Sequence, residues 1–497
     1  MKWKVLLLKM KKSTKIILST IFLAVLLLRL YFAFQTSHFS SDDAYFNIRH
    51  SEYITEHFQP IVHDDLSYGG RFILNSHIFH YILAIFNWIL PGMLAYKLIP
   101  AILTALLVFL VFAIAKEITN NETAALFSAL IVGVMPISFK MTLNQVSVYS
   151  LVLLLLLYVI YTFFDLRHNI NKFIIISLLL PLVHPIGFFF AVSMMVYLLL
   201  AGLESIKVDE LSKESIILVL FFNLLIAFIL FKDAFLTTGL GAVWQNVPSE
   251  LLSSYFRNIN VFEIITGIGI IPIVFGIIGF LFALKAKKKS IYVLSAFVLT
   301  DFLLLALKMI DFNTGLMILG LLLIIISAIA FDKFIAYLNM TKFLRFKRIV
   351  AGTFILIIIL SLGIPSIIVA KDTMKNSLSQ EEFETFTWIK LNTPQDATIL
   401  AGIDEGNYVT YIAERKNVAD NFFLLAPNRY SDIEELFKTQ SLVKAIDLIK
   451  KYKITHIYLS ERTKKIYNIK ELVYTRDENC FEKVFYTSKL EVYRIIC

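Results

Sequence analysis

Charged residues are scarce in this sequence. They make up 17% of its 497 residues, whereas ordinary soluble domains carry about 25%. Hydrophobic residues make up 58%, and apolar runs long enough to cross a bilayer recur from residue 15 to residue 369. This balance excludes an ordinary soluble protein and predicts a polytopic α-helical membrane protein.

Cysteine is almost absent. The chain has only Cys480 and Cys497, both close to its C-terminal end, so it has room for one disulfide at most. Two strand-like runs, Cys480–Tyr486 and Leu490–Ile496, predict a hairpin that brings the two cysteines to its open end. Outside the cell they would form a disulfide, and the alternative is a pair of buried thiols.

The surplus of positive charge indicates topology rather than a nucleic-acid surface. The net charge is +9, but the basic residues lie in short loops between apolar runs, where the positive-inside rule applies. The lysine-rich start is therefore expected in the cytoplasm. No small-residue cleavage site follows Leu30, so we expect an uncleaved first span rather than a signal peptide.

The apolar runs predict about eleven spans of near-bilayer length. In order, they cover 16–34, 94–115, 124–139, 146–164, 172–183, 185–201, 215–232, 262–284, 291–307, 312–330 and 349–369. A further stretch, 72–90, predicts a helix along the membrane interface with Trp88 as its anchor. If this stretch crossed the bilayer, several basic loops would fall on the wrong side.

Two parts of the chain are then expected outside the cell. The transmembrane domain is 1–370, with a long first outer loop at 35–93, and residues 371–497 form an extracytoplasmic α/β domain. Ser41 or Asp42 would cap a helix at the start of the loop. Elements expected in the outer domain, besides the hairpin, are a strand at Thr398–Ala401, an amphipathic helix at Ser441–Tyr452 and a strand at Ile454–Leu459.

The first outer loop holds the strongest chemical pattern. Its first half reads Asp43-x-Tyr45-Phe46-Asn47-x-Arg49, and its second half reads Asp64-Asp65-Leu66-Ser67-Tyr68-Gly69-Gly70-Arg71. Carboxylates at a membrane surface are costly to desolvate unless they hold a cation or face a cationic transition state. The loop is therefore the expected active-site loop.

This loop resembles the first outer-loop motif of the catalytic subunit of oligosaccharyltransferases, in the GT-C superfamily. Its second half is similar to that family's Asp-Asp-x-Ser-Trp-Tyr-Pro-x-Gly-Arg, in shortened form. The outer domain holds a fainter similarity to the region around the family's Trp-Trp-Asp-Tyr-Gly signature. The residues that carry it are Trp388, Asn392-Thr393-Pro394, Asp404-Glu405-Gly406-Asn407-Tyr408, Arg415 and Ala419-Asp420-Asn421.

The resemblance implies a membrane glycosyltransferase. Such an enzyme would move a sugar or oligosaccharide from a polyprenyl- or dolichyl-phosphate-linked donor to a protein or lipid acceptor at the outer face. Asp43 would be the catalytic base or a metal ligand. Phosphate-binding candidates are Arg49 and Arg71 from the motif, with Lys140 and Arg257 from loop position. Acceptor-binding candidates are Asp64, Asp65, Asp404 and Glu405.

The sequence departs from the family's pattern at two places. Gly402 and Ile403 stand where the family has two tryptophans that read the acceptor hydroxyl, so the acceptor stays open. The family's second outer loop ends in an acidic pair, whereas Asn144–Tyr149 here holds no acid. A divalent cation, Mg²⁺ or Mn²⁺, would then be held by Asp43 with Glu250, and metal dependence also stays open.

Each candidate has a plainer interpretation. Asp43 would then only cap a helix, Asp64 and Asp65 would form a turn before two glycines, and Asp404-Glu405-Gly406 would be another turn. Glu250 and Arg257 would be solvated loop charges. Six of the nine histidines lie between His38 and His80, which suggests a metal site, but we favour polar residues at the interface.

Two further classes of function compete with the enzyme. A non-catalytic membrane protein that binds or translocates glycolipid on the same scaffold would fit the missing acidic pair, but the intact motif from Asp43 to Arg49 opposes it. A transporter would carry ionisable residues within its spans. Asp301 lies in an apolar run and Asp311 near the end of one, which is slender support.

Overall fold

The computed structural model describes residues 10–73, 76–90, 92–238, 260–285, 288–340, 346–422 and 427–497. The chain clusters into two compact units. The helical unit comprises Met1–Ser37, Ser76–Leu230 and Tyr255–Lys375, and the α/β unit comprises His38–Asn75, Phe231–Ser254 and Asn376–Cys497. Both motif-bearing halves of the expected outer loop therefore fold together with the C-terminal domain.

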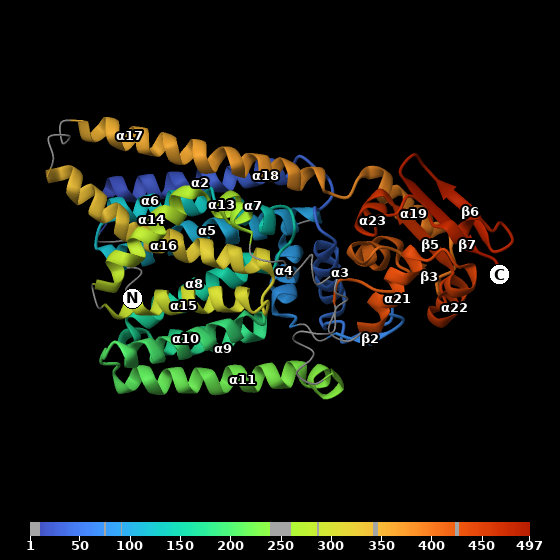
Figure 1. Ribbon diagram of the computed structural model, residues 1–497, viewed down its shortest axis with the longest axis horizontal. Coiled ribbons are helices and arrows are strands. Elements are labelled where there is room, and N and C mark those ends of the chain that lie inside the picture. The colour runs from blue at the N-terminus through green and yellow to red at the C-terminus, as the bar shows by residue number, and fades with distance from the viewer. Residues whose placement is uncertain are drawn as a thin grey trace. The chain divides into compact units, whose positions relative to one another are not determined.

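The helical unit consists of antiparallel and bent helices (Figure 1). They are α2 (Lys12–Ala33), α4 (Ile78–Ile89), α5 (Met93–Thr119), α6 (Glu122–Gly133), α7 (Pro136–Thr142), α8 (Tyr149–Phe164), α9 (Leu166–Val183), α10 (Ile186–Leu203), α11 (Glu210–Thr238), α13 (Val261–Ile268), α14 (Ile270–Lys285), α15 (Lys289–Ala306), α16 (Phe312–Met340), α17 (Lys347–Ile358), the π-helical turn η3 (Ile359–Gly363) and α18 (Ile364–Lys375).

The described part of the chain holds several candidate membrane spans, fewer than the eleven predicted. Among the described residues, 8 helices are long and apolar enough to cross a bilayer, or up to 10 if each of two bent pairs forms one span. The expected interface helix is the short α4, which begins at Ile78 rather than near residue 72 because Phe72 lies in a strand. The fold class is confirmed: a polytopic α-helical membrane protein with a C-terminal α/β domain.

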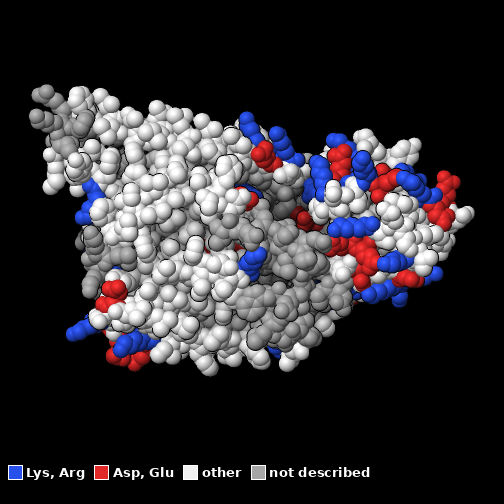
Figure 2. Space-filling view, in the orientation of Figure 1, with Lys and Arg blue, Asp and Glu red and all other residues white. Residues whose placement is uncertain are grey.

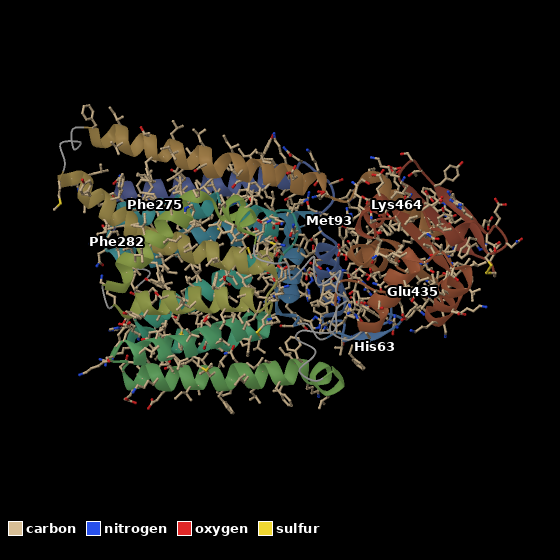
Figure 3. The ribbon with its side chains drawn as sticks, in the orientation of Figure 1. His63, Met93, Phe275, Phe282, Glu435 and Lys464 are labelled. Carbon is tan, nitrogen blue, oxygen red and sulfur yellow. A yellow bond between two sulfur atoms is a disulfide. The ribbon has the colours of Figure 1, made fainter. Side chains whose placement is uncertain are left out.

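The centre of the helical unit is α16, whose most apolar stretch is wholly buried. Its Phe331 ring stacks on Phe275 of α14, with the ring centroids 4.5 Å apart, and Figure 3 labels Phe275 there. A Cβ atom at Gly279 would lie 2.4 Å from the backbone oxygen of Ile326. Only glycine allows α14 to approach α16 so closely, which is how membrane helices commonly pack.

The part of the α/β unit from the first outer loop holds α3 (Asp42–His57), β1 (His63–Asp64) and β2 (Arg71–Phe72). Helix α3 begins as predicted, since the Ser41 side chain accepts the Ala44 N–H at 3.3 Å. Strands β1 and β2 pair antiparallel. Gly69 and Gly70 make the intervening turn with φ of 71° and 110°, which glycine adopts without strain.

The C-terminal part of the α/β unit surrounds a mixed sheet. Its elements are α19 (Gln380–Asn392), β3 (Thr398–Leu400), η4 (Ile403–Glu405), α20 (Gly406–Tyr408), η5 (Val409–Ala413), β4 (Lys416–Asn417), α21 (Pro427–Lys438), α22 (Leu442–Tyr452), β5 (His456–Ser460), α23 (Glu461–Ile466), η7 (Val473–Arg476), β6 (Phe481–Tyr486) and β7 (Leu490–Ile495). The strand order is β4-β3-β5-β7-β6, with β3 parallel to both β4 and β5 and the β6–β7 hairpin antiparallel.

Surface charge distinguishes the two units. The visible face of the helical unit is largely free of charged side chains along its helices, whereas the sheet-containing part of the α/β unit carries many of both signs (Figure 2). A surface of the first kind suits lipid and a surface of the second kind suits water.

Candidate active site

Helix α3 begins with two carboxylates in different environments. Asp42 is 5% exposed, and its Oδ1 accepts the backbone N–H groups of Asn407 at 3.0 Å and Tyr408 at 3.1 Å. Its Oδ2 accepts the Asn407 amide at 2.5 Å. Asp43, the next residue, is exposed and accepts a hydrogen bond from the Asn421 side chain. Asp42 is therefore an anchor, and Asp43 is the carboxylate that can meet a substrate.

The electrostatic environment of these two residues is acidic. Desolvation raises the pKa of Asp42 well above its ordinary value, and the negative charge of Asp43 adds to the effect. Although Asp43 is exposed to solvent on one side, the protein atoms packed around its carboxylate raise its pKa to about 6, first by loss of hydration and then by the charges of Asp404 and Asp420, while the Asn421 hydrogen bond lowers it. Such a cluster favours a bound cation or a positively charged reaction centre.

Arg49 lies two turns along α3 and forms a two-pronged ion pair with Asp64. Nη1 and Nη2 of Arg49 each lie 2.8 Å from one oxygen of the Asp64 carboxylate. The Asp64 side chain is 1% exposed and that of Arg49 is 17% exposed. This geometry gives the strongest kind of side-chain ion pair. The pair holds the β1–β2 hairpin against α3.

Arg71 forms an ion pair with a residue of the C-terminal domain, through one nitrogen rather than two. Its Nη2 lies 2.8 Å and 3.0 Å from the two carboxylate oxygens of Asp420, which is wholly buried. The guanidinium also lies over the rings of Tyr68, at 4.3 Å, and Phe422, at 5.1 Å. Ser67 donates a further hydrogen bond to Asp420 at 2.7 Å. Asp420 therefore binds both Ser67 and Arg71 and holds the tip of the β1–β2 hairpin in place.

The remaining candidates are scattered. Asp65 is 85% exposed and lies 3.0 Å from a ring nitrogen of His63, which Figure 3 labels in the hairpin. Lys140 lies in the helical unit at the end of α7, where its ammonium group donates to Asn313 at 2.8 Å. Glu250 and Arg257 fall outside the described residues.

Asp404 and Glu405 are neighbours with opposite surroundings. Glu405 is 1% exposed and accepts hydrogen bonds from Ser460 at 2.5 Å, Thr463 at 2.6 Å and the Gly402 N–H at 3.2 Å. Asp404 is partly exposed and lies close enough to raise the pKa of Asp43. Of these two neighbours, Asp404 is the one whose charge acts on Asp43.

Three residues of this site had no assigned role in the sequence analysis: Asn407, Asp420 and Asn421. All three lie in the stretch that carried the fainter family resemblance, so position alone could have singled them out. Their contacts with Asp42, Arg71 and Asp43 could not be foreseen, because the partners lie more than 300 residues away in the chain.

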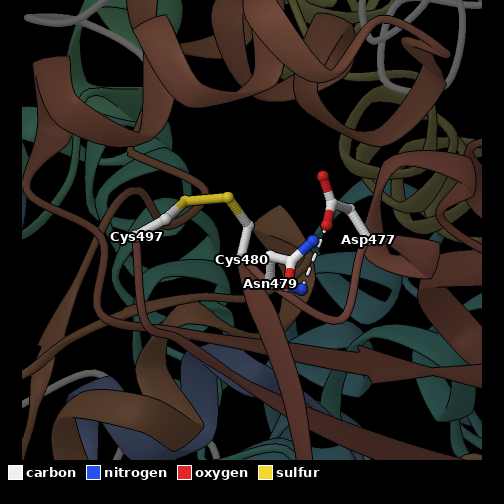
Figure 4. The surroundings of a disulfide bond; sticks show 4 residues. All are labelled: Asp477, Asn479, Cys480 and Cys497. Atoms are coloured by element: carbon white, nitrogen blue, oxygen red, sulfur yellow. Dashed lines mark hydrogen bonds between the residues drawn. A yellow bond between two sulfur atoms is a disulfide. The ribbon is translucent and has the colours of Figure 1, made fainter.

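A disulfide joins Cys480 and Cys497 at the open end of the β6–β7 hairpin (Figure 4). The Cα atoms lie 4.7 Å apart. Close by, the Asp477 carboxylate accepts the Asn479 N–H at 3.0 Å (Figure 4). The hairpin register is therefore the one that the sequence analysis required for a disulfide, rather than one that leaves two buried thiols.

Comparison with known proteins gives likeness of structure without likeness of sequence. No protein-family model matches this sequence, and no curated protein matches it. The archaeal oligosaccharyltransferase AglB from Archaeoglobus fulgidus, in complex with an inhibitory peptide and a dolichol-phosphate, superposes with a TM-score of 0.66 at 16% identity, over 88% of this chain and 69% of AglB. The A. fulgidus oligosaccharyltransferase with Zn and sulfate gives a TM-score of 0.64 at 16% identity, over 95% and 73%.

A second kind of enzyme matches over nearly its full length. ArnT from Cupriavidus metallidurans, bound to undecaprenyl phosphate, gives a TM-score of 0.56 at 11% identity, over 96% of this chain and 98% of ArnT. Both AglB and ArnT are glycosyltransferases of the GT-C type. The chain therefore has the GT-C fold, as the motif resemblance predicted, and identities this low establish the fold alone.

Proposed function

We propose that this protein is a membrane glycosyltransferase that transfers a sugar or oligosaccharide from a polyprenyl- or dolichyl-phosphate-linked donor. The observation that carries the proposal is Asp43, an exposed carboxylate with a raised pKa at the start of the first outer-loop helix of a GT-C fold. Structural relatives that bind dolichol-phosphate or undecaprenyl phosphate support this donor class.

In the proposed reaction, a nucleophilic atom of the acceptor attacks the anomeric carbon of the donor sugar. The new bond to that carbon forms while the bond from carbon to the phosphate oxygen breaks, and the lipid phosphate leaves with the electron pair. Asp43 takes the proton of the acceptor or orients the acceptor. A carboxyl group with a pKa near 6 is mostly ionised at neutral pH, and its carboxylate is a stronger base than that of an ordinary aspartate.

Cationic groups must stabilise the departing phosphate. Lys140, an exposed lysine of the helical unit, stays a candidate from its loop position alone. Arg49 and Arg71 are held by Asp64 and Asp420, so in this proposal each would meet the phosphate only with the part of the guanidinium that its ion pair leaves open. Arg257 completes the set that the sequence analysis proposed.

The described part of the site offers one carboxylate ligand, that of Asp43, to a divalent cation. Asp43 offers a carboxylate, and the charges that raise its pKa, those of Asp404 and Asp420, are negative. Hard oxygen ligands of this kind suit Mg²⁺ or Mn²⁺. When bound, such an ion supplies positive charge to the leaving phosphate. In this proposal Asp43 and Glu250 hold the ion, and Asp404 adds to the negative field around it.

We place the reaction at the outer face of the membrane, with the N-terminus in the cytoplasm. The basic loops of the sequence favour this orientation. The Cys480–Cys497 disulfide supports an oxidising compartment for the C-terminal domain. The acceptor is proposed as a protein or lipid group, with Asp64, Asp65, Asp404 and Glu405 as its candidate contacts, of which the buried Asp64 and Glu405 would act through their neighbours.

Donor consumption by the purified full-length protein tests the proposal. Extracted polyprenyl-phosphate-linked sugars, supplied with a native membrane extract as the source of acceptor, are followed by mass spectrometry. We expect Asp43→Asn to lower turnover by about 100-fold or more, the usual contribution of a positioned base. Glu56→Gln is the matched control, because this acid of the same helix is exposed and has no role in the proposed site, and it should leave the protein folded.

A chelator added to the same assay tests the cation. Loss of turnover, restored by Mg²⁺ or Mn²⁺, is expected. If wild-type protein binds the donor without consuming it, the enzyme proposal fails and the glycolipid-binding alternative takes its place.

A further inference from the structure

We infer that Asn421 is a positioning residue for Asp43, and that its two neighbours, the buried Asp420 and the partly buried Phe422, hold its amide in place. This inference deepens the proposed function and rests on it. The amide of Asn421 donates to Oδ1 of Asp43, so it fixes one carboxylate oxygen and leaves the other to meet a substrate or an ion.

The residue before Asn421 is fixed from several directions. Asp420 is wholly buried, and its carboxylate accepts hydrogen bonds from Arg71 at 2.8 Å and from Ser67 at 2.7 Å. Its backbone oxygen accepts the Tyr68 hydroxyl at 2.7 Å. A residue with both its side chain and its carbonyl engaged leaves its neighbour little backbone freedom.

The residue after Asn421 packs against the same helix as Asp43. The ring of Phe422 lies 4.6 Å from that of Phe46, measured between centroids, and its N–H donates to Asp420 at 3.0 Å. Phe46 lies three positions after Asp43, on the neighbouring turn of α3. The segment from Asp420 to Phe422 therefore runs along the first turn of α3 and carries the Asn421 amide to Asp43.

The backbone at Asp43 is fixed separately, through the contacts of the preceding residue, Asp42. The hydrogen bonds from Asn407 and Tyr408 fix the backbone at the start of α3, whereas Asn421 acts on the Asp43 side chain itself. Fixing the backbone sets where the carboxylate stands, and fixing one oxygen sets its rotamer. The two kinds of contact have separable consequences, because loss of a rotamer alone slows a reaction without unfolding the site.

Steady-state kinetics of donor consumption tests the inference. Asn421→Leu keeps the side-chain volume and removes the amide. We expect kcat to fall about 10- to 100-fold, as for a misplaced catalytic group, with KM for the donor changed by less than about threefold. Asn421→Gln keeps the amide on a longer arm and should recover part of the loss. Asn392→Leu is the matched control, because this exposed amide donates only within its own helix, to Trp388.

Equal kcat in Asn421→Leu and Asn392→Leu, with an active wild-type protein, would overturn the positioning role and leave the proposed function standing. A rise in KM with unchanged kcat would also overturn it, since Asn421 would then bind substrate instead of orienting Asp43.

A double-mutant cycle of thermal unfolding tests the hydrogen bond between Asn421 and Asp43 without any assay of activity. Unfolding midpoints are measured for Asp43→Ala, Asn421→Leu and the double variant of the full-length protein. We expect the two shifts to be non-additive, because the residues share a hydrogen bond. Additive shifts would overturn the contact itself. If the shifts are non-additive but the wild-type protein consumes no donor, the hydrogen bond exists and the proposed function fails, together with the positioning role that rests on it.

Discussion

Arg71 and Asp420 form an ion pair of 2.8 Å although 349 residues separate them in the chain. The pair joins the first outer-loop hairpin to the C-terminal part of the α/β unit. Arg71 came from the motif that suggested a phosphate ligand, and Asp420 came from a stretch with no assigned role. Their pairing means that Arg71 of the motif has a structural role in holding the site together, in addition to any contact with substrate.

The first prediction concerns this ion pair. Arg71→Leu leaves the Asp420 carboxylate buried without its cation, so we expect a loss of about 3 kcal/mol in the free energy of unfolding of the α/β unit. Thermal unfolding of the full-length protein measures it. Arg71→Leu combined with Asp420→Asn should recover part of the loss. Arg476→Leu is the control, because that arginine is 69% exposed and a surface ion pair contributes less than about 1 kcal/mol. Equal losses in Arg71→Leu and Arg476→Leu would contradict the structural role.

Much of this fold could be predicted from the sequence, because it follows from local patterns. The apolar runs gave the helical unit, the Ser41-Asp42-Asp43 start gave helix α3, and the alternation after Cys480 gave the β6–β7 hairpin. These features depend on spans of lipid thickness, helix capping and strand alternation, and each of them acts within a few residues.

The site was predicted only in part, because its assembly depends on contacts between distant segments. The sequence singled out Asp43 but could not show that Asp42 is turned inward to Asn407. It grouped Asp404 with Glu405, although Glu405 is buried under Ser460 and Thr463. Adjacent residues of a turn face different ways, and tertiary packing alone decides which of them meets solvent.

The second prediction is a pH dependence that comes from Asp43. The reaction needs the ionised carboxylate, so we expect the rate of donor consumption to fall as the pH drops through about 6, the raised pKa of this group. Added Mg²⁺ or Mn²⁺ should move this fall to lower pH if the ion binds the carboxylate. A rate that stays constant down to the ordinary range of aspartate, about pH 4, would show that Asp43 does not limit the reaction.

Stability should respond to the same group with the opposite sign. Because the pKa of Asp43 is higher in the folded chain than in the unfolded chain, the folded state gains relative stability as the pH falls through about 6 and keeps that gain below about 4. The thermal midpoint measured against pH, wild type minus Asp43→Asn, reports this contribution. Activity and this part of the stability should therefore change in opposite directions.

The third prediction separates the two acids of the η4 turn. Glu405→Gln removes a buried carboxylate that accepts three hydrogen bonds, so we expect a loss of about 1–3 kcal/mol in the free energy of unfolding. Asp404→Asn should leave stability nearly unchanged and shift the pH at which activity falls to lower values, because it removes a charge that raises the pKa of Asp43. Glu414→Gln, at a 55% exposed side chain, is the control. An unchanged pH profile in Asp404→Asn would remove Asp404 from the site.

The fourth prediction concerns the disulfide at the end of the sheet. The bond between Cys480 and Cys497 closes a short loop with a sequence separation of 17, and loss of a bond around a loop of that size costs about 3 kcal/mol. We expect Cys480→Ser combined with Cys497→Ser to unfold the α/β unit at a lower temperature, while the membrane helices keep their circular dichroism signal. Dithiothreitol should lower the wild-type midpoint to the same value and leave the double variant unchanged.

The same two cysteines also test the location of the domain. In intact cells, a thiol reagent that cannot cross the membrane should label Cys480 and Cys497 only after reduction. Labelling that requires permeabilised cells would contradict the outer location proposed for this domain.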